Sequence, residues 1–153
     1  MKEEILKERA KAEYKDACPE TKKKLVSIFG EDCFVENIME RVKTFEDACD
    51  VLGIEPCEIL SLSKTKDGIT YEKLKVIARA LNQGWVPNWS DTNERKWHPW
   101  FNATGSSGFG FSASGYDHWY SATCAGSRLC FISEALANYA GRQFESVYKE
   151  FMM

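Results

Sequence analysis

The residues of this sequence that could carry out chemistry are an aspartate, a histidine and a cysteine in its second half. Asp117 and His118 are adjacent, and Cys124 follows in the next segment. A thiol beside an imidazole, with a carboxylate that orients the ring, is the arrangement of a cysteine nucleophile. Adjacent residues of a strand project to opposite sides, so Asp117 and His118 do not suit this geometry. We favour a protein that is not an enzyme, with a small enzyme that uses these three residues as one alternative.

A metal site in the second half would have to use His98, His118, Cys124 and Cys130. Their spacing contains neither the Cys-x-x-Cys nor the His-x3–5-His pattern of zinc sites. The glycine-rich run at 105–110 is followed by no Lys-Ser/Thr pair and no helix, as a phosphate-binding P-loop requires. We therefore expect no metal and no cofactor.

Length and composition indicate one globular domain over residues 1–153, since 44% of the residues are hydrophobic and 28% are charged. The net charge is −3, and residues 101–153 hold three basic against four acidic residues, so we do not expect a nucleic-acid partner. No apolar run is long enough to cross a membrane, and the charged N-terminus is unlike a signal peptide. Cys49 and Cys130 lie in apolar patterns, so we expect the six cysteines to be free thiols in a reducing compartment.

Helical signals dominate the first half, residues 1–84. Thr44, with Asp47 three positions later, is typical of a helix start, and Gly53 is typical of a helix end. Pro19 suits the first turn of another helix. Composition and such signals predict helices at 2–17, from Pro19 to Gly30, from Thr44 to Gly53 and from Thr70 to Gly84, with a connecting loop at 54–69.

The composition changes after Gly84, because ten aromatic residues lie between Trp85 and Tyr120 among Gly, Ser, Asn and Asp. Short alternating segments separated by turn residues are typical of antiparallel strands. Residues 85–132 are therefore predicted to form a sheet of about four strands, near Lys96–Ala103, Gly108–Ala113, His118–Thr123 and Ser127–Ile132. Ser133 then begins a helix over 133–153, in which Gly141 indicates close packing against the sheet. The predicted fold class is α+β.

Two assumed turns give this sheet two different faces. A hairpin at Ala125-Gly126 pairs Tyr120 with Phe131, and a loop over 114–117 pairs Ala113 with His118. Phe109 and Phe111 then face the last helix. Small side chains cover the other face, beside a tryptophan and an arginine; its members are Gly108, Gly110, Ser112, Trp119, Ser121, Thr123 and Arg128.

A floor of small residues lets a ligand approach the backbone, while an indole stacks and a guanidinium donates hydrogen bonds. The sequence thus predicts a binding face, to which the Trp-rich segment 85–100 also contributes. Its residues are Trp119, Arg128, Ser112, Ser121, Thr123, Trp97 and Trp100. The alternative is structural: Gly108 and Gly110 would only make room for bulky neighbours such as Trp97 and Trp100. Both readings stay open at this point, since a one-residue slip exchanges the faces.

Three stretches of the chain resemble a known family. They are Thr44-Phe-Glu-Asp-Ala-Cys-Asp-Val-Leu-Gly-Ile54; Ala78-Arg-Ala-Leu-Asn-Gln-Gly-Trp-Val-Pro-Asn-Trp89 with Lys96-Trp-His-Pro-Trp-Phe101; and Gly126-Ser-Arg-Leu-Cys-Phe131 with Tyr139-Ala-Gly-Arg-Gln-Phe144. They are similar to proteins encoded by phages, prophages and mobile elements of gut bacteroidetes, over about residues 1–153. The resemblance implies a place in the host cytoplasm or on the virion, and it implies no particular activity or site residues.

A second resemblance is local. Trp89-Ser90 and Arg128-Leu-Cys-Phe131 look like the closing strands of C-type-lectin-like domains. The chain departs from those domains because about 45 residues cannot hold one and a long helix follows.

These observations favour a non-enzymatic binding protein that engages a host protein or a small ligand, as a host-interaction or anti-defence factor does. The alternatives are a structural or assembly protein of a virion and the small enzyme named above. We expect no membrane partner, and the sequence leaves the oligomeric state open.

Overall fold

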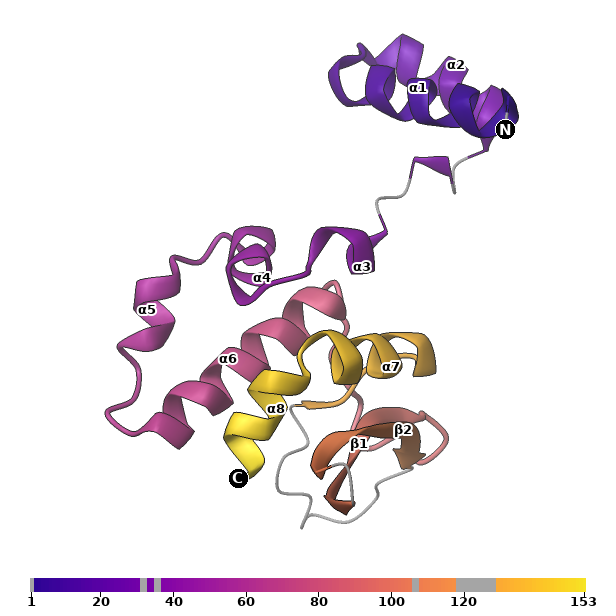
Figure 1. The fold of residues 1–153 in the computed structure, drawn as a ribbon. Coiled ribbons are helices and arrows are strands. Elements are labelled where there is room, and N and C mark those ends of the chain that lie inside the picture. Colours follow the sequence, from indigo (N-terminus) through magenta and orange to yellow (C-terminus); the bar gives the residue numbers. More distant parts are fainter. Residues whose placement is uncertain (1, 31–32, 35–36, 106–107, 118–128) are drawn as a thin grey trace. The chain divides into compact units, whose positions relative to one another are not determined.

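The computed structural model describes residues 2–30, 33–34, 37–105, 108–117 and 129–153 of the chain (Figure 1). The chain divides into two compact units, Met1–Asn37 and Ile38–Met153.

The N-terminal unit is a helical hairpin of α1 (Lys2–Asp16) and α2 (Pro19–Phe29). The composition of α1, rich in Glu, Lys and Ala, favours a helix. Pro19 occupies the first turn of α2, where its missing N–H costs no hydrogen bond, and Gly30 follows with φ +81°. Both helices confirm the prediction from sequence.

The second unit contains α3 (Ile38–Arg41), α4 (Phe45–Leu52), α5 (Pro56–Leu60), α6 (Lys66–Leu81), α7 (Glu134–Gln143) and α8 (Glu145–Met152). The predicted ends of α4 are confirmed. Thr44 Oγ1 accepts a hydrogen bond from Asp47 N at 3.0 Å, and Asp47 Oδ2 accepts one from Thr44 N at 2.8 Å. Gly53 closes the helix in the left-handed region, at φ +64°.

The predicted loop at 54–69 is wrong, because it contains α5 and the first turn of α6. Thr65, not Thr70, begins α6: its Oγ1 accepts a hydrogen bond from Gly68 N at 3.2 Å. Thr70 lies buried inside the helix and donates its hydroxyl to Lys66 O at 3.0 Å. The helix also ends earlier than predicted, at Leu81, so Gly84 follows two residues after the C-cap Asn82.

The sheet of the described residues is one antiparallel hairpin, β1 (Lys96–Gly105) and β2 (Gly108–Asp117). The prediction of about four strands is not supported. Residues 114–117 are not a loop, since they belong to β2 and Tyr116 pairs with Trp97. Ala113 pairs with Trp100, and its predicted partner His118 lies outside the described residues. The predicted third strand and the Ala125-Gly126 turn lie outside the described residues.

Phe131 supplies the one further bridge seen in the described part of this sheet. It pairs with Trp97 on the other edge of β1, through Trp97 N to Phe131 O at 3.0 Å and Phe131 N to Trp97 O at 2.8 Å. The expected partner of Phe131, Tyr120, lies outside the described residues.

A β-bulge sets which side chains of the hairpin face the helices. Trp100 pairs with Ala113 and Phe101 pairs with Phe111, so Ser112 is an extra residue of β2. One extra residue changes the alternation of a strand, and for this reason Phe111 and Tyr116 can lie on the same face. Phe109 and Phe111 face the helices, as predicted: Phe109 packs against the core and Phe111 lies against Gly141 of α7.

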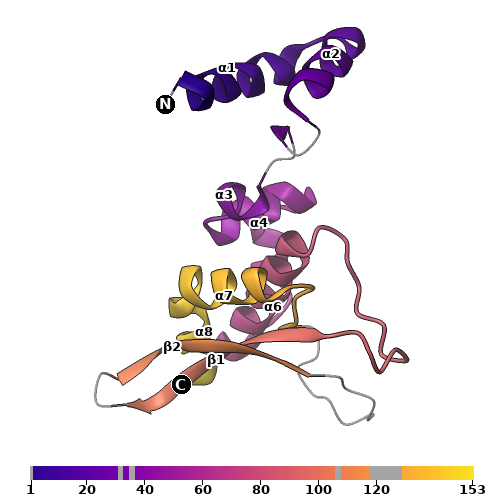
Figure 2. The same ribbon diagram turned by 90° about the vertical axis from the view of Figure 1, so that its right-hand side faces the viewer.

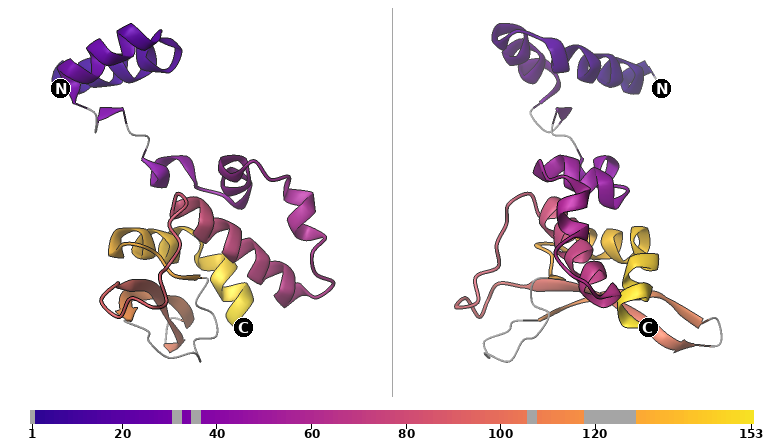
Figure 3. Two further views of the ribbon diagram at one scale, coloured as in Figure 1. Left: turned by 180° about the vertical axis from the view of Figure 1, so that it is seen from behind. Right: turned by 90° about the vertical axis from the view of Figure 1, so that its left-hand side faces the viewer.

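The second unit thus has a layered arrangement in which α7 and α8 cover one face of the hairpin (Figures 2 and 3). We call this the inner face of the hairpin. Helix α6 packs against α7 and α8, and its Leu74, Ile77 and Leu81 are buried with Phe131. Ser133 caps α7 as predicted, accepting a hydrogen bond from Leu136 N at 3.3 Å. The predicted single helix over 133–153 is divided at Phe144, which has φ −109° and ψ 24°.

Candidate functional site

Three residues of the predicted binding face lie in the part of the chain that the structure describes: Trp97, Trp100 and Ser112. The other four, Trp119, Ser121, Thr123 and Arg128, lie outside it. Asp117, His118 and Cys124 of the enzyme alternative have side chains outside it as well. The candidate site is therefore built from the hairpin itself.

Trp97 and Trp100 lie on opposite faces of β1. Trp97 is on the inner face, where its ring lies 4.8 Å from the ring of Tyr116 and packs against the hydrophobic core. Its backbone also holds Phe131 through two hydrogen bonds. These contacts give Trp97 a structural place in the core.

Trp100 lies on the outer face of the hairpin and is 62% exposed. Its indole lies over Gly115, because a Cβ atom added to Gly115 would be 2.9 Å from the Cε2 and Cζ2 atoms of the indole. Only glycine leaves room for the ring at this distance from the strand. The structural alternative drawn from the sequence had Gly108 and Gly110 make room for the tryptophans. An added Cβ at Gly108 meets nothing within 4 Å, and for Gly110 the nearest atom is Glu145 Oε2, at 3.9 Å.

Ser112, the bulge residue, is exposed and follows Phe111 in β2. Phe111 N donates a hydrogen bond to Glu145 Oε2 of α8 at 2.8 Å. This bond fixes the bulged strand to the helix layer. The predicted site residues Trp100 and Ser112 lie together in the middle of the hairpin, at the bulge where β1 and β2 leave the regular register.

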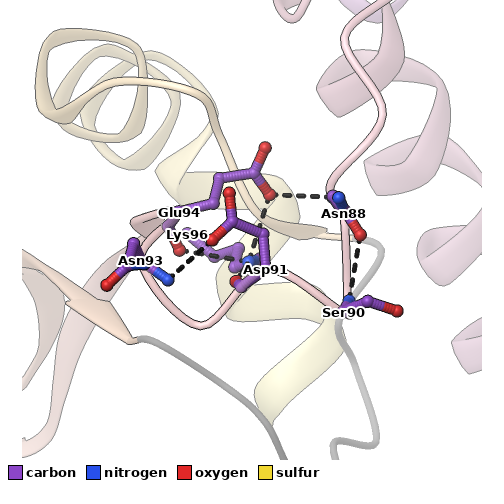
Figure 4. Close-up of polar contacts among 6 residues, drawn as sticks. All are labelled: Asn88, Ser90, Asp91, Asn93, Glu94 and Lys96. Carbon is purple, nitrogen blue, oxygen red and sulfur yellow. Dashed lines mark hydrogen bonds and ion pairs between the residues drawn. The ribbon is translucent and has the colours of Figure 1, made fainter.

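One end of the outer face, where β1 begins, is closed by Lys96, whose side chain has no exposed area (Figure 4). Residues two apart in a strand share a face, so Lys96, His98 and Trp100 follow one another along the outer face. Lys96 Nζ donates to Asp91 O at 3.0 Å and to Glu94 O at 3.1 Å, and it lies 3.1 Å from Glu94 Oε2. A buried ammonium group needs such partners because it has lost its water.

Lys96 is the anchor of the loop at 85–95 that leads into β1. Glu94 Oε2 also accepts a hydrogen bond from Asn88 N at 2.8 Å. Asn88 Oδ1 and Asp91 Oδ1 accept hydrogen bonds from Ser90 N and Asn93 N, as in turns made by Asn and Asp side chains (Figure 4). The ring centroid of Trp89, which is 40% exposed, lies 5.7 Å from Lys96 Nζ.

Sequence reasoning missed Lys96, although a signal was present. Residues 88–94 hold three Asn or Asp residues and a glutamate around a serine and a threonine, which is a composition typical of a tight polar turn. A lysine at the start of a strand gives no sign by itself that it is buried. Its burial depends on carbonyl groups that only the folded loop brings together.

A second polar contact positions β1 from the core side. Asn82 Nδ2 donates to Cys130 O at 2.8 Å, and Asn82 Oδ1 accepts from Ile132 N at 3.1 Å. The amide thereby binds the backbone on both sides of Phe131, and Phe131 in turn pairs with Trp97. Asn82 was not singled out from the sequence, since it follows the helix as an ordinary cap residue.

The thiols of the described residues are free at Cys18, Cys33, Cys49, Cys57 and Cys130, as predicted, while Cys124 lies outside them. Burial raises the pKa of the Cys130 thiol to about 11. Cys130 is thus protonated at neutral pH and is not the thiolate that a nucleophile or a metal ligand requires. Within the described residues, no three His, Cys, Asp or Glu side chains are grouped closely enough to hold a metal ion.

No protein-family model, curated protein or solved structure matches this chain. In the described part of the chain, no helix is both long enough and apolar enough to cross a membrane.

Proposed function

We propose that this chain is a non-enzymatic binding protein and that the outer face of its hairpin, around Trp100, engages a protein partner. The observation that supports the proposal is that Trp100 of β1 is 62% exposed and that Gly115 of the neighbouring strand β2 leaves room for its indole. Tryptophans of this kind are the side chains that contribute most to protein–protein interfaces.

The position of the indole also lowers the cost of binding. Trp100 is confined on one side by the backbone of Gly115, and the bulge at Ser112 is fixed through Phe111 N and Glu145. A side chain that is held in place before binding loses less conformational entropy on binding. The face combines a preplaced apolar ring with an exposed serine beside it.

The kind of partner is part of the proposal. The resemblance to phage and mobile-element proteins favours a protein of the bacterial host, as for a host-interaction or anti-defence factor, and a small ligand is the other possible occupant. An assembly role on a virion would use the same exposed ring as a contact between subunits. The small-enzyme alternative stays a prediction from sequence, because Asp117, His118 and Cys124 have no described side chains.

A photo-crosslinking amino acid at Ser112 tests whether this face meets a partner. Ser112 is exposed beside the pair Trp100–Ala113, and Ser146, exposed on α8, is the matched control position. We expect crosslinks to one discrete protein from Ser112 in host cells and none to that protein from Ser146. Equal products from both positions would contradict the proposal.

Affinity for the protein that is crosslinked then tests Trp100 itself. We expect Trp100→Ala to weaken binding by at least about 2 kcal/mol, roughly thirtyfold. Gly115→Ala should weaken it less, since the added methyl group displaces the indole without removing it. Val86→Ala, at a side chain that is 77% exposed, is the control and should leave the affinity unchanged. An unchanged affinity of Trp100→Ala would remove the proposal.

A further inference from the structure

The N-terminal unit has almost no buried core. Among its described residues only Ala10 is buried, and α2 contributes no buried side chain. Its packing consists of half-buried rings: Tyr14 stacks on Phe34 at 4.4 Å, and Phe29 meets Phe34 edge to face at 6.3 Å. Because hydrophobic stabilisation grows with the area removed from water, these contacts are less than a folded unit ordinarily needs.

Small units are generally stabilised by disulfides, by metals or by association. Cys18 and Cys33, the two cysteines of this unit, have free thiols. The described residues of the unit contain no group of three side chains that could hold a metal ion. Association is the remaining means of stabilisation.

Large aliphatic side chains of the helical hairpin of α1 and α2 are exposed to solvent. Ile28 is 70% exposed, Leu6 is 55% exposed and Ile5 is 51% exposed. Residues five apart in an α-helix differ by about 140° around the axis, so Ile5 lies well away from the side of α1 that buries Ala10. The hairpin therefore presents apolar side chains outside the contact between α1 and α2.

We infer that the N-terminal unit associates with the same unit of a second copy of this chain, so that two helical hairpins form a four-helix bundle. In such a bundle the exposed apolar side chains of each hairpin are covered by the helices of the other. In this arrangement Ile5, Leu6 and Ile28 pack against the other copy, and the half-buried rings of the hairpin become part of a common core.

The charges of the unit fit a second copy of itself. Residues 1–37 contain eight basic and nine acidic residues, so the net charge is −1 and two copies repel each other little. Within α1, residues 2–8 hold two lysines and three glutamates, while residues 9–16 hold three basic and two acidic residues. A twofold axis that makes the two α1 helices antiparallel places the acidic half of each beside the basic half of the other.

Light scattering on the full chain at several concentrations tests this inference. We expect a mass of twice 17.5 kDa at high concentration, with dissociation on dilution. The double variant Ile5→Lys with Ile28→Lys should raise the dissociation constant of the dimer by more than about tenfold, since charged groups then enter the shared core. The matched control is Leu62→Lys with Val86→Lys, at side chains that are 62% and 77% exposed in the second unit. It should dimerise like the unchanged protein.

Hydrogen exchange provides a measurement that needs no substitution. The amide protons of α1 and α2 should become more protected as the protein concentration rises, while those of α6 and α7 should not change. A monomer at every concentration would overturn the inference. It would mean that the helical hairpin is covered by the second unit or by another protein. A dimer that persists in the Ile5→Lys, Ile28→Lys variant and is lost in Trp100→Ala would overturn the inference as well. It would favour the assembly role of the outer face of the β-hairpin.

Discussion

At the scale of single residues, Lys96 shows how a charge determines the local structure. Its ammonium group has no exposed area and lies among the carbonyl groups of Asp91 and Glu94 and the carboxylate of Glu94. The contact holds the loop against the first residue of β1, four residues before Trp100. We regard Lys96 as a positioning residue for the outer face of the hairpin.

Lys96→Met should lower the free energy of unfolding by about 2–4 kcal/mol. The methionine keeps most of the apolar stem, but it leaves the carbonyl groups of Asp91 and Glu94 without the lysine donor and the Glu94 carboxylate without its cation. Urea denaturation followed by far-ultraviolet circular dichroism measures the loss. The control is Lys66→Met, because the ion pair of Lys66 with Glu150 is exposed and should contribute less than about 0.5 kcal/mol. An equal loss in both variants would contradict the role of Lys96.

The buried thiol of Cys130 makes the free energy of unfolding depend on pH in the alkaline range. Burial raises the pKa of this thiol from 9.0 to about 11. Between these values the unfolded chain releases a proton that the folded chain keeps, so the free energy of unfolding falls as the pH rises. The stabilisation is fully present below pH 9, and its loss amounts to at most about 1.4 kcal/mol per pH unit.

Urea denaturation of the unchanged protein and of Cys130→Ala at pH 8, 9 and 10 tests this expectation. The variant should be less stable at pH 8, because it loses packing, but its stability should fall less between pH 9 and 10. Burial also raises the pKa values of Tyr148 and Cys49, so these two groups lower the stability at alkaline pH as well. Both groups are present in the unchanged protein and in the variant, so they do not account for a difference between the two. Identical slopes would show that Cys130 is not the group responsible.

At the scale of elements, the β-hairpin and α7 lie in close contact at Gly141. An added Cβ atom would lie 2.3 Å from Phe111 Cδ2 and 2.8 Å from Pro99 Cβ. This contact explains a glycine inside a helix, where it otherwise costs about 1 kcal/mol. It also fixes the inward direction of Phe111, on which the two faces of the hairpin depend.

Gly141→Ala should therefore destabilise the protein by about 1–3 kcal/mol, although alanine is the better helix former. The added methyl group has to displace the Phe111 ring or move α7 away from β1. Thermal unfolding measures the change, and Ser146→Ala on the exposed side of α8 is the control, with an expected change within about 0.5 kcal/mol. Stabilisation by Gly141→Ala would show that the helix and the hairpin are farther apart than we describe.

At the scale of the whole molecule, the two units differ in what stabilises them. The hydrophobic core cluster lies entirely between Val42 and Tyr148, within the second unit, and includes α4, α6, α7 and Phe131. Two side chains of this core region also bind the segment before α4: Tyr139 Oη donates to Val42 O at 2.9 Å, and Gln143 Nε2 donates to Lys43 O at 2.9 Å. The second unit thus has its own core and the first depends on association.

We expect residues 38–153 alone to fold, with a melting temperature within about 3 °C of that of the full chain. The reason is that the hydrophobic core cluster, from Val42 to Tyr148, lies wholly within this range. Differential scanning calorimetry of both proteins at low concentration measures the difference. Failure of residues 38–153 to fold would mean that the first 37 residues complete the core, and it would contradict the division into units.

The sequence by itself determined the features that depend on neighbours within four positions. Thr44 with Asp47, Gly53, Pro19 and Ser133 begin or end helices through their own backbone and nearest turn, and all four predictions are confirmed. The inward direction of Phe109 and Phe111 was predicted correctly, although the assumed loop at 114–117 on which it rested is wrong. The close packing at Gly141 followed from the cost of glycine in a helix. Where the local signals were weak, as between Ile54 and Ile69, the helices were missed.

Only the tertiary structure decided which aromatic side chains are exposed. Trp97 and Trp100 have the same composition around them, but Trp97 lies half-buried against the hydrophobic core beside its bridge to Phe131, whereas Trp100 lies 62% exposed over Gly115. The burial of Lys96 depends on a loop in the same way. These outcomes depend on contacts between segments that are distant in the sequence, and their energies appear only when the chain brings those segments together.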